Sequence, residues 1–570
     1  METEENKKKI KMESLLFHKA SGVYFPGREG NDPAGQISYS DGAAIEGRML
    51  RDLRKIRDVR DGSEELLKIC RDWPSSYHFG PGRSNFLRAF SFPRNSKVLE
   101  LGAGCGAITR YLGENFLSVD AVEGSFKRSC IARERCRDLE NVRVFCSNIS
   151  EVDPGDDHDL VIMSGVLEYA PLYIGGNEEE ACRSLIDIAE RALKPGGKLV
   201  LAIENRIGLK YWSGCPEDHT GRIYDGIHGY PLPGKAVTFT KTELSRLFLN
   251  TSFSNIDFHY CFPDYKFTSV IFSDVPSEAD GYLHNWIKVP FPSYGTGRGR
   301  TFHEGLAVKT LSESGILKQF ANSFAVLAHK QGKDAYSGQE WAAQSFSIMN
   351  RKESFRCVTV LKRGDHPIVE KIKLVPEACS KEHVEGVIHK TSPSPWVKGD
   401  LLIFDVYKAS LGRGAHFRII GLLKEYYQEL IRRYSSGKKD EQGYDLLEGT
   451  ALDFTFRNII RGEKGWSQID IEWVSTGMLS ADYVLYRNCL NVVEALKSSP
   501  SRRVFPGECL SFGYIKAVLP GYTLLRHIRN MKDERALQRS ITMGFSPESF
   551  YRGHRMVVHA FKTIMARLFG

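Results

Sequence analysis

The stretch Val98-Leu-Glu-Leu-Gly-Ala-Gly-Cys-Gly-Ala-Ile-Thr-Arg-Tyr-Leu112 decides the fold of this chain. Val98 to Leu101 predicts a short buried strand, Gly102 to Gly106 a tight turn, and Ala107 to Leu112 the start of a helix. A strand that leads through a glycine-rich turn into a helix N-terminus brings bare backbone close to a ligand, as in nucleotide-binding α/β folds. We therefore expect an α/β sheet with a ligand site at this turn.

Two features of the turn argue against a dinucleotide ligand. Its glycines follow the spacing G-x-G-x-G, whereas a dinucleotide turn has G-x-G-x-x-G to make room for a pyrophosphate. Glu100 precedes the turn, where it would repel a diphosphate and attract an ammonium group. In both respects the stretch resembles motif I of the class I S-adenosylmethionine (SAM) methyltransferases. The resemblance implies that SAM is the cofactor and that it contacts Glu100, Gly102, Ala103, Gly104 and Gly106.

The next two predicted strands carry polar residues at their carboxyl ends. The second strand ends at Glu123, which lies 21 positions after the first glycine of the turn. A carboxylate at this place accepts both ribose hydroxyls of a bound nucleotide in sheets of this topology. The third strand, over 141–147, is followed by Asn148 and Ile149, the predicted adenine contacts. Related enzymes usually carry Asp at the position of Asn148, so here only the amide carbonyl is left to accept a bond from adenine.

Strands and helices then alternate along the chain. Residues 159–171 predict the fourth strand and a loop that contains Gly165, a predicted cofactor contact. A helix is predicted for 180–193, and a turn and a fifth strand for 193–203. This succession is typical of a doubly wound parallel sheet. We therefore predict a Rossmann-like methyltransferase domain over residues 76–335.

The segment Tyr77-His-Phe-Gly-Pro-Gly-Arg-Ser-Asn-Phe-Leu87 precedes the glycine turn. In similar methyltransferases such a segment lies across the cofactor, which implies that Arg83 pairs with the cofactor carboxylate. The alternative is a solvated Arg83 at the start of a surface helix. Residues 1–75 are predicted to form a leader that packs on this domain, with one helix near 46–58.

Several blocks after the fifth strand are rich in glycine and polar residues, and they lie where open α/β sheets place their sites. They resemble a family of methyltransferases from bacterial surface-polysaccharide gene clusters. The resemblance implies O-methylation of a sugar hydroxyl, with a glycan or nucleotide-sugar acceptor as the partner. The blocks that carry it are 204–214, 216–221, 224–230, 262–266 and 321–325.

Methyl transfer to a hydroxyl requires that the two reactants are aligned and that a proton is removed. His219 is the first candidate for the base, because it lies in a glycine-flanked loop and titrates in the useful range. Glu168 and His228 are further candidates. The alternative is that Asp218 and His219 only fix the loop. Asn205 and Arg206 are predicted to bind the acceptor hydroxyls. Weaker candidates for this site are Asp264, Tyr265 and Lys266.

The sequence pattern changes after residue 340. Strands are predicted for 345–361, 368–374 and 401–407, and an amphipathic helix for 421–434. Asp453 is followed by Asn458 and then by Asp470, the spacing of the catalytic and metal loops of kinase-like folds. The Asp-Ile-Glu variant at 470–472 is similar to phosphotransferases of the aminoglycoside and choline type. That likeness implies a kinase-like domain over 340–570, with Mg-ATP bound by Lys371, Asn458 and Asp470, and with Asp453 facing the acceptor.

Two departures from the kinase pattern leave several interpretations open. The usual His two residues before the catalytic Asp is Ala451, and residues 340–363 contain no glycine-rich loop. The domain is therefore interpreted as an active kinase in a bifunctional enzyme that caps a polysaccharide chain, as a degenerate docking module, or as an unrelated α+β domain. An NAD-linked oxidoreductase is the remaining alternative for the first half.

Composition sets broad limits on function. The 570 residues suffice for two or three domains, and the net charge of +8 is compatible with an anionic glycan, a nucleotide or a membrane surface. The twelve cysteines form no C-x-x-C pair, so neither a zinc site nor a disulfide framework is indicated, and no metal ligands are predicted.

No apolar segment approaches the ~20 residues of a membrane span, so we expect a cytoplasmic protein. No nucleic-acid partner is predicted. The basic helix predicted over 551–569 either closes a core or rests on an anionic membrane at its inner face. The oligomeric state does not follow from the sequence.

Overall fold

The computed structural model describes residues 9–26, 40–174, 177–232, 236–294, 298–332, 339–375, 384–463, 465–498 and 507–544. The chain forms two compact units, each of which is described by itself. Unit 1 comprises 1–275, 293–296 and 318–349, and unit 2 comprises 276–292, 297–317 and 350–570. Most of 276–317, which the predicted domain limits place in the methyltransferase domain, thus belongs to unit 2. The helix predicted over 551–569 lies outside the described residues.

The centre of unit 1 is a sheet with the strand order β10-β12-β9-β8-β4-β5-β6. All neighbouring strands are parallel except β12, which is antiparallel to both β10 and β9. The strands are β4 (Lys97–Leu101), β5 (Ser118–Glu123), β6 (Val142–Cys146), β8 (His158–Ser164), β9 (Leu193–Glu204), β10 (Phe253–Phe262) and β12 (Ser323–Lys330). The predicted doubly wound α/β sheet is confirmed.

The order of the strands creates a switch point between β4 and β8. From β4 the chain proceeds outward through β5 and β6, and then returns to the other side of β4 with β8 and β9. In open α/β sheets, ligands bind outside the carboxyl ends of the strands at such a point. The strands themselves are apolar because both faces are covered: Val98, Leu99 and Leu101 of β4 are fully buried.

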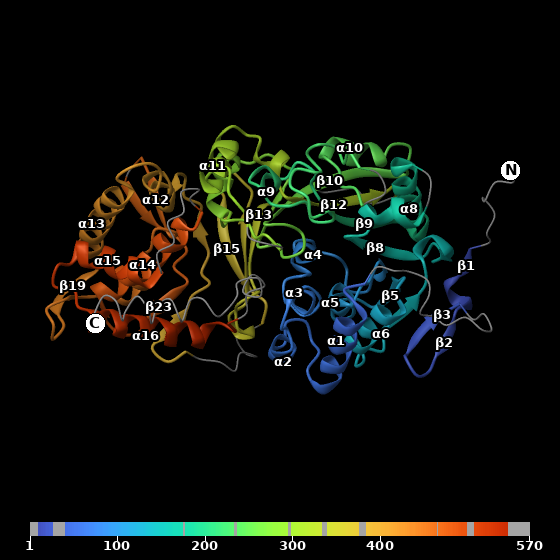
Figure 1. The fold of residues 1–570 in the computed structure, drawn as a ribbon, viewed down its shortest axis with the longest axis horizontal. Helices are drawn as coiled ribbons and strands as arrows, with labels where there is room; N and C mark the ends of the chain where they lie inside the picture. Colours follow the sequence, from blue (N-terminus) through green and yellow to red (C-terminus); the bar gives the residue numbers. More distant parts are fainter. Residues whose placement is uncertain are drawn as a thin grey trace. The chain divides into compact units, whose positions relative to one another are not determined.

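Helices cover the sheet of unit 1 (Figure 1). α5 (Ala107–Asn115) and α6 (Phe126–Arg135) pack together beside β5, and α8 (Glu178–Ala192) packs beside β8 and β9. α10 (Lys241–Leu247) contacts α8. The helix predicted near 46–58 is α1 (Ala43–Lys55), which packs on α6.

Additional strands extend both edges of this sheet. β3 (Val23–Phe25) pairs with β6 and with β2 (Leu16–His18). On the opposite side β11 (Val270–Ser273) pairs with β10 and with β13 (Trp341–Ser347). The short helices α2 (Glu64–Lys68), α3 (Trp73–Phe79) and α4 (Asn85–Arg88) precede β4. The leader therefore contributes strands as well as a helix to unit 1.

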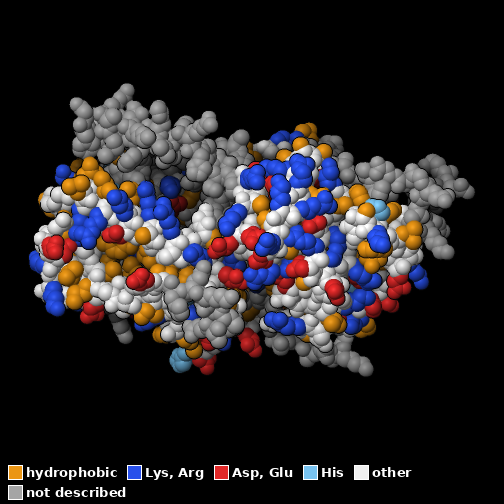
Figure 2. Space-filling model, turned by 90° about the horizontal axis from the view of Figure 1, so that it is seen from below, with side chains coloured by type: hydrophobic (Ala, Val, Ile, Leu, Met, Phe, Trp, Pro, Cys, Tyr) orange, Lys and Arg blue, Asp and Glu red, His pale blue; other side chains and the backbone are white. Residues whose placement is uncertain are grey.

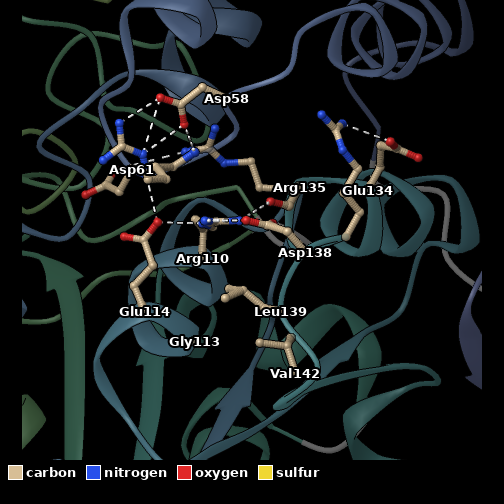
Figure 3. Close-up of polar contacts among 12 residues, drawn as sticks. Asp58, Asp61, Arg110, Gly113, Glu114, Glu134, Arg135, Asp138, Leu139 and Val142 are labelled. Atoms are coloured by element: carbon tan, nitrogen blue, oxygen red, sulfur yellow. Dashed lines mark hydrogen bonds and ion pairs between the residues drawn. The ribbon is translucent and has the colours of Figure 1, made fainter.

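An arginine on α5 ties this helix to the end of α6 (Figure 3). The Arg110 guanidinium is almost fully buried and forms an ion pair with each of Glu114 and Asp138. It also donates a bond to the backbone oxygen of Arg135 (3.2 Å). These contacts fix α5, which starts at the glycine turn, against the end of α6.

Unit 2 is an α+β unit. Its strands include the antiparallel pairs β14 (Cys357–Lys362) with β15 (Ile368–Lys373) and β21 (Ile459–Gly462) with β22 (Gly465–Gln468). Its helices include α12 (Ile403–Ala409), α13 (Ala415–Tyr434), α14 (Ala481–Leu496), α15 (Gly507–Val518) and α16 (Leu524–Ile541). The prediction of a strand over 401–407 is wrong, because most of this run forms α12. A short apolar run of this kind is compatible with a buried helix as well as with a buried strand.

Lys and Arg side chains are mixed with Asp and Glu side chains over the face seen in Figure 2. Among the helices in the described ranges, none has the length and apolar character needed to cross a membrane.

Candidate functional site

The glycine turn after β4 forms a cradle with one open side. Gly102, Gly104 and Gly106 all have positive φ angles of +83°, +54° and +81°. A Cβ on Gly102 would lie 2.3 Å from the Val166 side chain, and one on Gly106 would lie 2.8 Å from the Ala132 Cα. A Cβ on Gly104 would instead meet no atom closer than 4.0 Å. The turn is therefore closed toward the protein and open at Gly104.

Glu123 fastens the turn to the end of β5. Its carboxylate accepts bonds from the backbone N–H groups of Gly104 (2.8 Å) and Ser125 (2.9 Å). The N–H groups of Gly102 and Ala103 both donate to the carbonyl of Val122. Burial raises the pKa of Glu123. Each carboxylate oxygen carries two lone pairs, so Glu123 can still accept bonds from a ligand.

Glu100 is a buried carboxyl group beneath the turn. Its side chain accepts a bond from Thr109 Oγ1 (2.5 Å) on α5. Burial raises the pKa of Glu100 to about 7, and the nearby Glu123 adds to the increase. This group therefore changes its charge near neutral pH, and the affinity for a ligand with an ammonium group would change with it.

The other predicted cofactor residues lie at the ends of the neighbouring strands. Asn148 caps a short helix over 149–151 and accepts a bond from the N–H of Ser150 (3.2 Å), and Ile149 is half-buried like it. Gly165 directly follows β8 with φ +69°, where a Cβ would lie 2.3 Å from the Tyr265 hydroxyl. No contact in the structure tests their role in binding, which stays a prediction.

Arg83 is buried, so the alternative of a solvated surface residue is wrong. Its guanidinium donates to the backbone oxygen of Lys266 (3.0 Å) and to the Tyr77 hydroxyl (3.0 Å), and it stacks on the Tyr77 ring. Its Nε is buried without a partner among the described residues. Arg83 thus fixes the segment before the turn, and its pairing with a cofactor carboxylate stays a prediction.

Three titratable side chains converge at the carboxyl ends of β8 and β9, and we call them the acid–histidine cluster: Glu168, Glu204 and His219. A carboxylate oxygen of each acid and a ring nitrogen of the histidine all lie within 4.8 Å of one another. His219 Nε2 lies 3.4 Å from Glu204 Oε2, and His219 Nδ1 lies 3.0 Å from the Tyr169 hydroxyl. The two predicted catalytic residues therefore lie side by side.

Glu168 and His219 have opposite electrostatic settings. Both oxygens of Glu168 are buried without a hydrogen-bond partner in the described part of the chain. Burial and the neighbouring Glu204 raise the pKa of Glu168 to about 8. Burial opposes a charge on His219, but the carboxylates of Glu204, Glu168 and Glu217 outweigh it and raise the His219 pKa to about 9. His219 therefore carries a proton at neutral pH.

The loop around His219 is fixed by its neighbours. Asp218 accepts bonds from the Tyr211 hydroxyl (2.5 Å) and pairs with Lys210 (2.6 Å). Glu217 accepts the backbone N–H of His219 (2.9 Å). The loop-fixing role considered for both Asp218 and His219 thus belongs to Asp218, while the His219 ring faces Glu204 and Tyr169.

Sequence reasoning missed Glu204 and Lys210 as members of this site and undervalued Lys266. Lys266 Nζ forms an ion pair with Glu204 and lies 3.4 Å from Asp218. The position of Glu204 could have identified it from the sequence, because it ends the fifth strand and ligand sites of these sheets lie at the carboxyl ends of the strands.

The two residues predicted to bind acceptor hydroxyls, Asn205 and Arg206, and the further base candidate His228 lie in other surroundings. Asn205 donates to the backbone oxygens of Gln319 (2.9 Å) and Ala321 (2.8 Å). Arg206 forms an ion pair with Glu243, and His228 is exposed in a turn. The contacts of Asn205 and Arg206 join segments of unit 1, and none of them is made with the acid–histidine cluster.

The predicted kinase-like residues of unit 2 also come together, and with Glu472 we call them the Lys371 cluster: Lys371, Asp453, Asn458, Asp470 and Glu472. Lys371 Nζ lies 2.6 Å from both Asp470 and Glu472. Asp453 accepts the backbone N–H groups of Glu472 (2.9 Å) and Trp473 (2.6 Å), and Asn458 donates to the backbone oxygen of Asp453 (3.1 Å). Burial raises the pKa of Asp453 to about 6. Sequence reasoning assigned no role to Glu472, which also pairs with Arg351 and His389.

Comparison with known proteins supports part of this picture. Residues 99–199, from β4 to β9, match the family model described as a methyltransferase domain. The demethylmenaquinone methyltransferase of Tropheryma whipplei (strain Twist) is 32% identical over 105 residues, which cover 18% of this chain and 40% of that protein. The chain therefore spans about two fifths of the length of this curated relative. The match identifies a methyltransferase domain in unit 1.

Solved structures give weaker likenesses. A SAM-dependent methyltransferase of Thermotoga maritima is 16% identical, with a TM-score of 0.26, over 44% of this chain and 88% of that one. Phosphoethanolamine N-methyltransferase 2 of Haemonchus contortus is 14% identical, with a TM-score of 0.29, over 49% of this chain and 61% of that one. At these values no statement on function follows.

Proposed function

We propose that unit 1 transfers the methyl group of SAM to a hydroxyl group of a surface polysaccharide or its precursor. The observation that carries the proposal is the cradle at Gly104, which opens at the switch point of the sheet beside the buried Glu100 and the half-buried Glu123. The match of residues 99–199 to a methyltransferase domain supports it.

The residues of the cradle fit the chemical groups of SAM. The bare backbone of Gly102 to Gly106 would admit the cofactor at close range, and Glu100 would pair with its ammonium group in the ionised form. Glu123 would accept the ribose hydroxyls, with Asn148 and Ile149 at the adenine and Arg83 Nε at the carboxylate. When bound, SAM supplies the methyl group on its positively charged sulfur.

On the acceptor side the acid–histidine cluster would position the hydroxyl and take its proton. Glu168 follows the loop of Gly165, so it lies beside a predicted cofactor contact. In its ionised form, which is populated above its raised pKa of about 8, Glu168 would accept the hydroxyl proton, and His219 and Tyr169 would orient the group. The acceptor oxygen then attacks the methyl carbon in line with the leaving sulfur.

Binding experiments separate this proposal from the oxidoreductase alternative. Isothermal titration of the full chain should show that SAM and S-adenosylhomocysteine bind and that NAD does not. Incubation with methyl-labelled SAM and a panel of polysaccharide intermediates and nucleotide sugars should then transfer label to one of them. Binding of NAD in place of SAM would overturn the proposal, and label on an amine would overturn the hydroxyl assignment.

A second candidate function concerns unit 2. Bifunctionality as a methyltransferase and kinase is favoured by the convergence of Lys371, Asp453, Asn458 and Asp470, which the kinase-like spacing predicts. In that case the Lys371 cluster would bind Mg-ATP and phosphorylate the acceptor. Mg-ATP should then raise the melting temperature of the full chain, and Asp470→Ala should abolish the increase. No increase with the unaltered chain would favour the docking-module interpretation.

The proposal places the reaction in the cytoplasm. A role at the inner face of the membrane would depend on the predicted helix over 551–569, which lies outside the described residues. Sedimentation with vesicles that contain anionic lipid tests this, with uncharged vesicles as the control.

A further inference from the structure

We propose that Glu168, Glu204 and His219 bind a divalent metal ion. The side chains come from three separate segments: the short 3-10 helix Leu167–Tyr169 after β8, the last residue of β9, and the loop after α9 (Leu209–Trp212). One potential ligand atom of each lies within 4.8 Å of the other two, so a single ion could contact all three.

An independent observation points to a missing ligand at this place. Glu168 is fully buried, and neither of its carboxyl oxygens has a hydrogen-bond partner in the described part of the chain. A buried polar group without a hydrogen-bond partner destabilises the fold, and it does so more strongly if it is charged. A cation in contact with Glu168 would remove this cost.

The outer contacts of the cluster suit metal ligation. His219 Nδ1 lies 3.0 Å from the Tyr169 hydroxyl, which leaves Nε2 directed toward Glu204. Because imidazole binds a metal in its neutral form, the ion would displace the proton that His219 carries at neutral pH. Lys266 pairs with Oε1 of Glu204 and so leaves Oε2 for the ion. Metal-binding imidazoles and carboxylates are commonly held by such partners on the atom that does not face the metal.

The donor set indicates the class of ion. Two carboxylates and one imidazole favour a transition metal such as Mn²⁺ over Ca²⁺ or Mg²⁺, which prefer oxygen alone. Three protein ligands leave positions open on the ion. This inference rests on the proposed function for its purpose: one oxygen of Glu168 would bind the ion and the other would remain to take the hydroxyl proton. The open positions would bind the acceptor hydroxyl, lower its pKa, and hold its oxygen beside the cofactor loop of Gly165.

Metal binding to the full chain without SAM or acceptor is the decisive test. After treatment with a chelator, titration with Mn²⁺ followed by calorimetry and by electron paramagnetic resonance should show one site per chain. Glu168→Gln and His219→Asn should each weaken this site by at least about tenfold. Asp274→Asn, which removes an acid paired with Lys241 elsewhere in unit 1, is the control and should bind Mn²⁺ like the unaltered chain.

The outcomes separate this inference from the proposed function. Absence of saturable Mn²⁺ binding by the folded chain would overturn the metal site, as would equal binding in both cluster variants. Loss of the site in Glu472→Gln in place of Glu168→Gln would overturn it too, because Cys357, His389 and Glu472 form another close group in unit 2. Methyl transfer that continues in excess chelator would contradict the metal alone, whereas intact Mn²⁺ binding without SAM binding would contradict the proposed function alone. Circular dichroism verifies that each variant is folded.

Discussion

The glycine turn of unit 1 and the Lys371 cluster of unit 2 are both predicted ligand sites, but they are built in opposite ways. The turn presents backbone groups, and an added Cβ at Gly104 would meet no atom closer than His78 Cε1, at 4.0 Å. The Lys371 cluster presents charged side chains that already neutralise one another, with Lys371 at 2.6 Å from both Asp470 and Glu472.

This difference bears on how each site would accept a ligand. A cradle of backbone is ready for its ligand, because no internal contact has to break. In the Lys371 cluster a nucleotide phosphate could bind Lys371 only by replacing the two carboxylates in their ion pairs with it. A metal ion could bind these carboxylates only by replacing Lys371. Filling the turn should therefore affect binding, and breaking the Lys371 cluster should affect stability.

The largest expected effect comes from filling the turn. Gly104→Leu should lower the affinity for S-adenosylhomocysteine by at least about 100-fold, because the side chain would occupy the open side of the cradle. The backbone strain of a side chain at positive φ, of about 1–2 kcal/mol, needs a separate control. Gly155→Leu provides it, since Gly155 has φ +80° and a Cβ there would meet only Asp157, at 3.9 Å. Calorimetry that finds equal binding in both variants would contradict the cradle.

Breaking the Lys371 cluster should have the next largest effect. Lys371→Met leaves the buried Glu472 with Arg351 and His389 but without its lysine, and it should reduce the free energy of unfolding by about 2–3 kcal/mol. The matched control is Lys362→Met on the adjacent strand, whose pair with Glu370 is half-exposed. That change should cost less than about 1 kcal/mol. Urea unfolding of the two variants measures the difference, and equal values would mean that the Lys371 cluster adds no stability.

The pH dependence of cofactor binding should be the smallest effect. The raised pKa of Glu100, about 7, means that the group is mostly neutral at pH 6 and mostly ionised at pH 8. Because only the ionised form attracts the cofactor ammonium, S-adenosylhomocysteine should bind up to about tenfold more tightly at pH 8 than at pH 6.

Two controls isolate the contribution of Glu100 to this pH dependence. 5′-Methylthioadenosine lacks the amino acid portion and should show no such increase, and Glu100→Gln should remove it for S-adenosylhomocysteine. An increase that persists in Glu100→Gln would assign the titration to another group, such as Glu123.

Local sequence patterns predicted the features that depend on few residues. The strand, turn and helix over 98–112 follow from three glycines between two apolar segments, and the structure has them as β4 and α5. Where a pattern was short and wholly apolar it failed, as at 401–407, where burial in unit 2 selects a helix. The strands β2 and β3 have only three residues each, so they depend on the edge of β6 rather than on their own sequence.

The sequence by itself determined the succession of strands and helices from β4 to β9, the glycine turn, and the acids Glu100 and Glu123 beside it, because each depends on neighbours along the chain. Only the tertiary structure decided that Glu168, Glu204 and His219 meet, and that Lys266 from the β10–β11 connection pairs with Glu204. Their convergence depends on the return of the chain across β4, and their charges depend on burial and on one another. Neither can be inferred from residues that lie 15 to 62 positions apart in the sequence.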